Sequence, residues 1–340
     1  MRYLFDLGHP AHVHYFKFII KSLKLNGNEV IVTARNKDVT FALLEAEKIK
    51  YASRGNGANS TFGKLLYLIW GSLLLTWIGK RNKVDMYIGF GSPYAAFASF
   101  VNGKKSVILD DTENALLGQS FYRRFATTIL SPDSFSKDFG MKHSKFKSFM
   151  ELFYLHPEVF SSTVDEREEN SIALLRFVGW NAAHDAGHNG ISLEAKKRIV
   201  EKLETFGFRV SISSEDKLPD SLQKYALKIN PADMHEFLSR CSLLVGESAT
   251  MASEAAMLGV PAFYFDNEGR GYTDALQKKY DLVFNYNESD EAVDQAIAKL
   301  SEVIGRDKTY WLNQRELLLA DNFNPNKFLL TELINTAKNV

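Results

Sequence analysis

A chain of 340 residues is too long for one ordinary domain and fits two domains of about 150–170 residues each. Hydrophobic residues make up 45% of the chain and charged residues 24%, which is the composition of a globular protein with an ample core. Basic and acidic residues balance at 41 each, so there is no overall basic field to hold nucleic acid, and we expect no nucleic-acid partner.

The single cysteine, Cys241, cannot form an internal disulfide, which favours a reducing compartment. The first ten residues contain a short apolar run that Asp6 interrupts, and they show no secretory pattern. We therefore expect a cytoplasmic protein.

Strands and helices alternate from the start of the chain. The pattern predicts strands over Tyr3–Leu7 and Glu29–Thr33, and helices over Tyr15–Leu25 and Asp38–Lys48. Such βαβ units imply a parallel sheet that binds ligands over the carboxyl ends of its strands. The fold class is therefore predicted to be α/β, with a Rossmann-like first half.

The turn after the first strand, Gly8–His14, contains three histidines within six residues. No carboxylate or thiol within the turn completes a ligand set, so we expect no metal site. Histidine titrates near neutral pH, which suits a general base or a hydrogen-bond partner of a substrate. We take His12 and His14 as candidate bases, and Gly8 and His9 as candidate walls of a cleft. Neighbouring backbone groups are expected to satisfy at least one of the three histidines.

The most apolar segment spans residues 62–78. It is shorter than the roughly 20 residues that span a bilayer, so we favour a helix buried against the sheet. The alternative is a peripheral membrane contact through residues 62–83, on the inner face of the membrane. That contact would use an outer face with two tryptophans and a basic cluster, namely Trp70, Trp77, Lys80, Arg81 and Lys83.

Two further turns follow predicted strands over Asp85–Ile88 and Lys105–Leu109. The first turn is rich in glycine, and the second carries three acids within residues 110–113. Such acids can serve as metal ligands, as a general base or as an ordinary N-cap of the next helix. The candidates are Asp111 as a base and three cleft-wall residues, Gly91, Ser92 and Glu113. Another strand is predicted over Phe125–Leu130.

The charged stretch 161–170 is the best candidate for a linker. The predicted domains are residues 1–160 and 161–325, followed by a C-terminal helix, 326–340, that packs back on the first domain. A strand over Ser171–Phe177 opens the second sheet. Arg176, near its end, is a candidate phosphate clamp, with a surface ion pair as the alternative.

The stretch 246–261 (GESATMASEAAMLGVP) lies between two short apolar runs that predict parallel strands. Its turn presents backbone N–H groups and a helix dipole to an anion, and Gly259 ends the helix. Glu254 lies about one turn into the helix, within reach of a hydroxyl of the bound molecule. We interpret the stretch as a nucleotide-diphosphate site; an ordinary crossover with a solvated glutamate is the alternative. The candidate donor-binding residues are Arg176, Gly246, Ser248, Ala249, Thr250, Met251 and Glu254.

Two other segments of the second half complete the prediction. A short strand is expected over Leu227–Ile229. The polar loop over residues 266–272 contains Arg270, which we take as a further cleft-wall residue.

Two Rossmann-like halves with a diphosphate motif in the second resemble the GT-B architecture of glycosyltransferases and UDP-sugar epimerases. That resemblance implies two parallel-sheet domains facing a central cleft. Residues 253–263 (SEAAMLGVPAF) are similar to the donor-site segment of the N-acetylglucosaminyltransferase that makes the peptidoglycan lipid precursor. The similarity implies that Glu254 holds ribose hydroxyls, that residues 246–251 bind diphosphate and that residues 231–234 contact uracil.

The whole chain resembles a bacterial and archaeal family known as domain of unknown function 354. Its members are GT-B-like and often belong to surface-polysaccharide gene clusters. The matching segments are residues 6–17, 89–96, 110–114, 151–160, 176–185 and 250–261. Glu247 departs from the glycine-rich turn usual in the family. A carboxylate there would repel a diphosphate unless its side chain points away.

The resemblance implies a metal-independent glycosyltransferase without a cofactor, which moves a sugar from a UDP-sugar donor to a polysaccharide or lipid-linked acceptor. The donor is expected on the second domain and the acceptor on the first. His12, His14 or Asp111 would deprotonate the acceptor, and Arg176 with residues 248–251 would stabilise the departing diphosphate. The alternatives are a UDP-N-acetylhexosamine 2-epimerase or UDP-sugar hydrolase on the same fold, and a non-catalytic binding partner.

Overall fold

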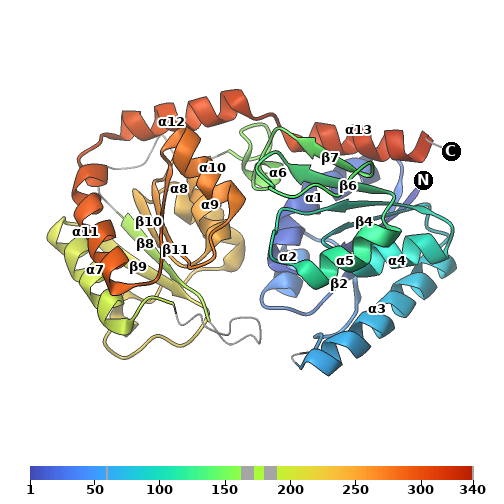
Figure 1. The fold of residues 1–340 in the computed structure, drawn as a ribbon, viewed down its shortest axis with the longest axis horizontal. Coiled ribbons are helices and arrows are strands. Elements are labelled where there is room, and N and C mark those ends of the chain that lie inside the picture. Colours follow the sequence, from blue (N-terminus) through green and yellow to red (C-terminus); the bar gives the residue numbers. More distant parts are fainter. Residues whose placement is uncertain (59, 162–171, 180–189, 339–340) are drawn as a thin grey trace. The chain divides into compact units, whose positions relative to one another are not determined.

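The computed structural model describes residues 1–58, 60–161, 172–179 and 190–338, and it divides into two compact units (Figure 1). Unit 1 comprises Met1–Tyr154 with Phe323–Val340, and unit 2 comprises Leu155–Asn322. Residues 162–170 of the expected linker lie outside the described residues, as does the loop over residues 180–185.

Unit 1 is built on a seven-stranded parallel sheet in the order β3-β2-β1-β4-β5-β6-β7. Its strands are β1 (Arg2–Leu7), β2 (Glu29–Ala34), β3 (Ala52–Ser53), β4 (Met86–Phe90), β5 (Lys105–Leu109), β6 (Thr128–Pro132) and β7 (His143–Phe146). The order reverses between β1 and β4. In open α/β sheets, ligands bind where the strand order reverses, at the carboxyl ends of the strands.

Helices cover both faces of this sheet. They are α1 (Pro10–Leu25), α2 (Thr40–Ala46), α3 (Thr61–Arg81), α4 (Pro93–Val101), α5 (Leu116–Phe125), α6 (Leu152–Leu155) and α13 (Pro325–Lys338). Phe5 packs on Phe16 of α1 at 5.4 Å between ring centroids, while Leu4 belongs to a buried cluster with Leu75 of α3 and Tyr122 of α5. Since successive strand residues point to opposite faces, α1 covers one face and α3 and α5 the other.

The C-terminal helix α13 belongs to unit 1. Asn326 donates a 2.8 Å hydrogen bond to the Phe153 carbonyl, and the Thr336 hydroxyl lies 3.3 Å from that of Thr128. The chain therefore returns from unit 2 to its first sheet.

Unit 2 is built on a five-stranded parallel sheet in the order β12-β11-β10-β8-β9. Its strands are β8 (Ile172–Phe177), β9 (Arg209–Ser214), β10 (Leu243–Gly246), β11 (Ala262–Phe265) and β12 (Val283–Tyr286). Its helices are α7 (Leu193–Thr205), α8 (Met234–Ser239), α9 (Ala249–Met257), α10 (Gly271–Tyr280), α11 (Asp290–Ile304) and α12 (Lys308–Asp321). Here the strand order reverses between β8 and β10. The α/β prediction is confirmed, with a parallel sheet in each unit.

Three local predictions are wrong. The expected strand over Phe125–Leu130 is the end of α5 followed by β6, and no strand forms over Leu227–Ile229, where one isolated bridge joins Ile212 and Ala226. Helix α3 is not buried against the sheet as we favoured. A narrow face is buried (Gly71, Ser72, Leu75, Ile78 and Gly79), while Trp70 and Trp77 are about half exposed.

Within the described ranges, residues Phe62–Arg81 are the one helical stretch that is long and apolar enough to cross a membrane, by length and composition alone. The same helix contributes Leu75 and Ile78 to the buried cluster that contains Leu4 of β1. Its inner face is therefore committed to the fold of unit 1.

A substitution on the inner face of α3 tests how this helix packs on unit 1. A Cβ added to Gly79 would lie 1.8 Å from the Tyr87 hydroxyl, which accepts a 2.6 Å hydrogen bond from Asn102. We predict that Gly79→Ala lowers the free energy of unfolding by about 1–3 kcal/mol, because the core must shift to admit the methyl group. In urea denaturation, Tyr87→Phe should recover part of the loss in the double variant. Additive effects of the two substitutions would contradict this contact.

Candidate functional site

The turn after β10 lies at the point where the strand order of unit 2 reverses. A Cβ on Gly246 would lie 2.1 Å from the Arg176 carbonyl oxygen, so only glycine fits beside β8. The next N–H, from Glu247, donates a 2.9 Å bond to that same carbonyl. The close approach of β8 and β10 therefore fixes where the turn begins.

Helix α9 starts directly above this turn. Ser248 is its N-cap, and its hydroxyl accepts a 3.3 Å hydrogen bond from the Met251 N–H. Ala249 and Thr250 follow as the first helical residues, and the first N–H groups of a helix have no partner inside it. These N–H groups and the helix dipole favour an anion at this end.

Glu247 points away from the turn into the interior of unit 2. Its side chain is fully buried; the carboxylate accepts hydrogen bonds from the N–H groups of Val178 and Ile191, both at 2.9 Å. The ammonium group of Lys196 on α7 lies 3.3 Å away. Glu247, which departs from the family pattern, thus connects segments inside unit 2. Its negative charge does not face the side of the turn where an anion would bind.

Glu254 is held by a histidine that the sequence analysis did not single out. His235 of α8 lies with its Nε2 3.0 Å from the Glu254 carboxylate, and both side chains are largely buried. Glu254 is therefore not solvated, as the alternative of an ordinary crossover had assumed. The rest of α8, β10 and the turn that opens α9 separate the two residues along the chain, so no local pattern indicated their contact.

Arg176 and Arg270 both have protein partners at the carboxyl edge of unit 2. The Arg176 guanidinium donates to Ser213 at 2.9 Å and to Glu215 at 2.6 Å. Arg270 is the N-cap residue of α10 and lies 3.7 Å from Asp266, in the loop after β11. The ion pair we considered for Arg176 is therefore present, with Glu215 as its partner.

The corresponding edge of unit 1 is organised by Asp6, which is buried near the end of β1. Its carboxylate accepts hydrogen bonds from Arg54 at 2.8 Å, from Ser92 at 2.6 Å and from Thr33 at 3.0 Å. The Ser92 hydroxyl also caps α4 by accepting from Ala95 at 3.1 Å. Ser92, predicted as a cleft wall, therefore braces β4 against β1.

The Arg54 guanidinium lies beside the histidine turn. A Cβ on Gly8 would lie 3.3 Å from an Arg54 nitrogen and 3.7 Å from His12. The guanidinium also stacks over the Tyr94 ring, 4.3 Å from its centroid. Gly8 thus allows the turn to approach this buried cation. The signal in the sequence was a charged residue, Asp6, inside an otherwise apolar strand.

His9 and His12 are fixed by backbone donors. Nδ1 of His9 accepts from the Ala11 N–H at 3.2 Å, and Nδ1 of His12 accepts from the Gly8 N–H at 3.1 Å. Burial, followed by Lys37 and Arg35, lowers the pKa of His9 to about 3. Burial, followed by the charges of His9, Arg54 and Lys37, also holds the pKa of His12 well below its ordinary value.

Both rings are therefore neutral near pH 7. Each uses Nδ1 as an acceptor, so its proton is on Nε2. His12 consequently offers a hydrogen-bond donor at its other nitrogen. His14 lies two residues further along α1, with its ring stacked on that of Tyr154 at 5.1 Å between centroids.

The three acidic residues after β5 have different surroundings. Asp110 is buried and accepts from Tyr122, Gln119 and Thr112, and burial raises its pKa. Asp111 accepts a 3.1 Å hydrogen bond from the Thr112 hydroxyl, and Glu113 accepts from the Ser136 N–H at 3.3 Å.

The remaining predicted wall residue, Gly91, has a φ of 49° and donates to the Leu109 carbonyl at 2.7 Å. Its left-handed conformation is the one that favours glycine. In the part of the chain that the structure describes, no group of three or more His, Cys, Asp or Glu side chains is arranged to hold a metal ion.

Comparison with known proteins gives the family of this chain. The sequence profile of the family described as "Protein of unknown function (DUF354)" matches residues 1–323, so the chain belongs to that family. An uncharacterized protein of Methanocaldococcus jannaschii, MJ0665, is 22% identical over 274 residues, which cover 75% of this chain and 79% of the relative.

Solved structures share the fold over almost the whole chain. The UDP-GlcNAc 2-epimerase of Neisseria meningitidis bound to UDP-GlcNAc has a TM-score of 0.71 at 14% identity, covering 98% of this chain and 100% of the other. The spinosyn forosaminyltransferase SpnP has a TM-score of 0.68 at 12% identity (99% and 100%). MurG of Acinetobacter baumannii has a TM-score of 0.63 at 14% identity (98% and 100%). The chain therefore has the GT-B fold of sugar-nucleotide enzymes, as its sequence predicted.

Substitution of Glu247 tests this connection inside unit 2. We predict that Glu247→Gln lowers the free energy of unfolding by about 1–3 kcal/mol, because an amide cannot accept both backbone hydrogen bonds and balance Lys196. Glu236→Gln, on the exposed face of α8 in an ion pair with Arg240, is the control and should change it by less than about 1 kcal/mol. Equal effects in urea denaturation would refute this buried connection.

Because its pKa is lowered, His9 should make the stability of the fold depend on pH. Between pH 6.5 and about 3, the unfolded state binds a proton at this residue that the folded state excludes, so stability falls as the pH falls through this range. We predict that His9→Asn, which keeps an N-cap acceptor, reduces the fall of the urea midpoint between pH 6.5 and pH 4.5. His12 still titrates in the variant, so part of the slope remains. Identical slopes in both proteins would contradict the assignment.

Proposed function

We propose that the protein is a GT-B-type glycosyltransferase that moves a sugar from a UDP-sugar donor to a polysaccharide or lipid-linked acceptor. The observation that carries the proposal is the start of α9 in unit 2, which follows the turn at residues 246–248. Glu254, buried and held by His235, lies one and a half turns further along this helix. Family membership and the shared fold support a sugar-nucleotide enzyme.

The donor would bind over the carboxyl ends of β8 and β10. Its diphosphate would accept hydrogen bonds from the first N–H groups of α9, and its ribose hydroxyls would donate to Glu254. Two observations support this pose: Glu247 faces the interior, and His235 holds Glu254 in place. The similar epimerase of N. meningitidis is described as bound to UDP-GlcNAc, and that precedent supports a uridine nucleotide here.

The acceptor would bind unit 1 at the edge between β1 and β4. A base takes the proton of the acceptor hydroxyl, whose oxygen then forms a bond to the anomeric carbon while the bond from that carbon to the diphosphate breaks. His14 and Asp111 are the candidates for the base. His12, with its proton on Nε2, is better suited to donate a hydrogen bond to the substrate. The departing diphosphate gains its stabilisation from the helix N-terminus, without a metal.

A 2-epimerase or hydrolase is the second candidate, because epimerases of this fold superpose on the chain with TM-scores up to 0.71. Incubation with UDP-N-acetylglucosamine alone separates the activities. The epimerase would yield the 2-epimeric UDP-sugar, and the hydrolase would yield UDP and free sugar. The transferase requires an acceptor for turnover. A cytoplasmic location and a role in polysaccharide synthesis belong to the same proposal.

Substitution of Glu254 tests the donor site. We predict that Glu254→Ala weakens UDP binding about tenfold or more in isothermal titration calorimetry, because two ribose hydrogen bonds to a charged acceptor are lost. His235→Ala should weaken it less, since the carboxylate remains but loses its support. Glu236→Ala, an exposed neighbour, is the control and should bind UDP normally. An unchanged affinity in Glu254→Ala would refute the ribose assignment.

A further inference from the structure

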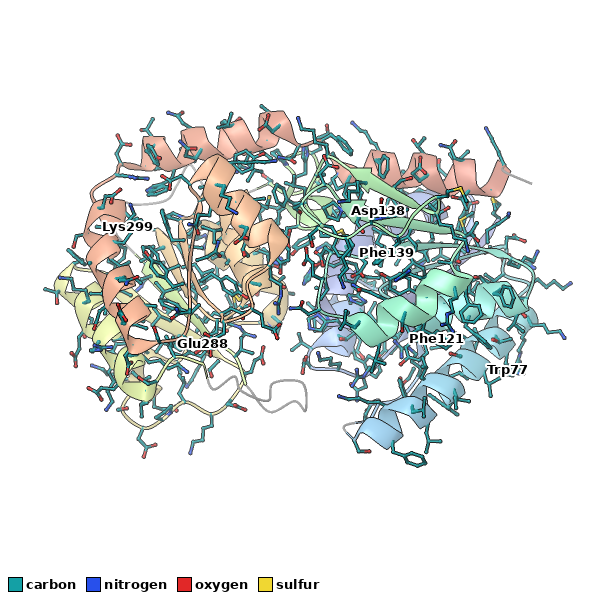
Figure 2. The ribbon with its side chains drawn as sticks, in the orientation of Figure 1. Trp77, Phe121, Asp138, Phe139, Glu288 and Lys299 are labelled. Atoms are coloured by element: carbon teal, nitrogen blue, oxygen red, sulfur yellow. The ribbon has the colours of Figure 1, made fainter. Side chains whose placement is uncertain are left out.

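One side of α3 exposes large apolar side chains along its whole length. They recur every three or four residues, as one face of a helix requires, and their exposed fractions run from 48% for Trp70 to 70% for Phe62. The members are Phe62, Leu65, Leu66, Ile69, Trp70, Leu73 and Trp77, which we call the α3 surface. Figure 2 shows Trp77 at the surface of this helix.

The α3 surface continues onto the end of α4. Phe100 and Val101 are 62% and 51% exposed there, and Val101 lines one pocket together with Thr76 of α3. Contiguous exposed apolar patches of this kind mark interaction sites, because isolated proteins bury such side chains. The fold of unit 1 uses the opposite, glycine-containing face of the helix, so the α3 surface has no role in the core.

Three basic residues, Lys80, Arg81 and Lys83, lie at the C-terminal end of the α3 surface. Residues 61–83 contain no aspartate or glutamate. The Arg81 guanidinium lies over the Trp77 ring, 5.2 Å from its centroid. Lys80 and Lys83 line a pocket of about 960 Å³ at the end of the helix, with Lys104 beyond them.

The acids of this pocket are already engaged. Glu29 pairs with Arg2 at 2.6 Å, and Asp85 pairs with Lys104 at 3.4 Å and accepts the Arg2 N–H at 2.9 Å. Lys80 and Lys83 are both exposed at the helix end. The positive charge at this end is therefore available to an anionic partner.

We propose that the α3 surface and the basic end of α3 dock on an anionic lipid bilayer. The apolar side chains would enter the boundary between headgroups and acyl chains, with the tryptophans at headgroup depth and the lysines on lipid phosphates. A second copy of the chain fits less well. A two-fold contact places the same patch on both partners, and the acids next to its cations, Glu29 and Asp85, are already paired with Arg2 and Lys104.

Side chains beside the α3 surface connect it to the carboxyl edge of the unit 1 sheet, where we place the acceptor. Tyr67 of α3 accepts a 2.9 Å hydrogen bond from Arg54 and lies 5.6 Å from the Trp70 ring. Arg54 pairs in turn with Asp6 at the end of β1. If the proposed function holds, a lipid-linked acceptor would stay in the bilayer while its polar end reaches this edge; the docking itself does not depend on the activity.

Vesicle sedimentation of the full chain tests the docking. We predict that the protein sediments with vesicles of phosphatidylcholine and phosphatidylglycerol, binds phosphatidylcholine vesicles weakly, and is released by salt. The double variant Trp70→Ser, Trp77→Ser should bind the mixed vesicles about tenfold more weakly. Lys80→Glu with Lys83→Glu should remove the preference for anionic vesicles.

Two substitutions in unit 2 serve as matched controls, Leu317→Ser for the apolar change and Lys279→Glu for the charge change, and both should bind vesicles normally. All variants should keep the thermal midpoint and the UDP affinity of the parent, so that a lost fold or a failed donor site is recognised separately. Absent binding to mixed vesicles, equal binding to neutral ones, or a self-association that the tryptophan variants abolish would each overturn the proposal.

Discussion

A buried carboxylate near the end of a central strand fixes the carboxyl edge of each sheet. In unit 2, Glu247 joins the turn after β10 to the segment after β8 and to the start of α7, through Val178, Ile191 and Lys196. A buried charge is costly unless it is paired and hydrogen-bonded, so these three segments must come together for the unit to fold. The turn that opens α9 is thereby held in one shape.

Asp6 likewise connects separate segments at the carboxyl edge of the sheet in unit 1. It joins β1 to β2 through Thr33, to the turn before α4 through Ser92, and to the segment after β3 through Arg54. In both units the carboxylate lies where the strand order reverses, which is the place where α/β sheets bind ligands. Both edges are thus rigid frames, suited to hold a substrate in one orientation.

The sequence predicted those features that follow from local pattern. Apolar runs and helix caps located β10, α9 and the closing Gly259, because burial and capping depend on neighbouring residues. The sequence alone could not predict contacts between residues that are far apart in the chain. The pairing of His235 with Glu254, or of Arg54 with Asp6, depends on which strands become neighbours, and no local pattern specifies that. The buried direction of Glu247 likewise depends on N–H groups that lie far away in the chain.

Hydrogen exchange with and without UDP tests the central claim, that a nucleotide binds at the strand-order reversal of unit 2. We predict that UDP slows exchange in peptides covering residues 246–254, where the first N–H groups of α9 would gain an acceptor, and leaves peptides from β1 to α1 unchanged. Protection confined to unit 1, or none at saturating UDP, would contradict it.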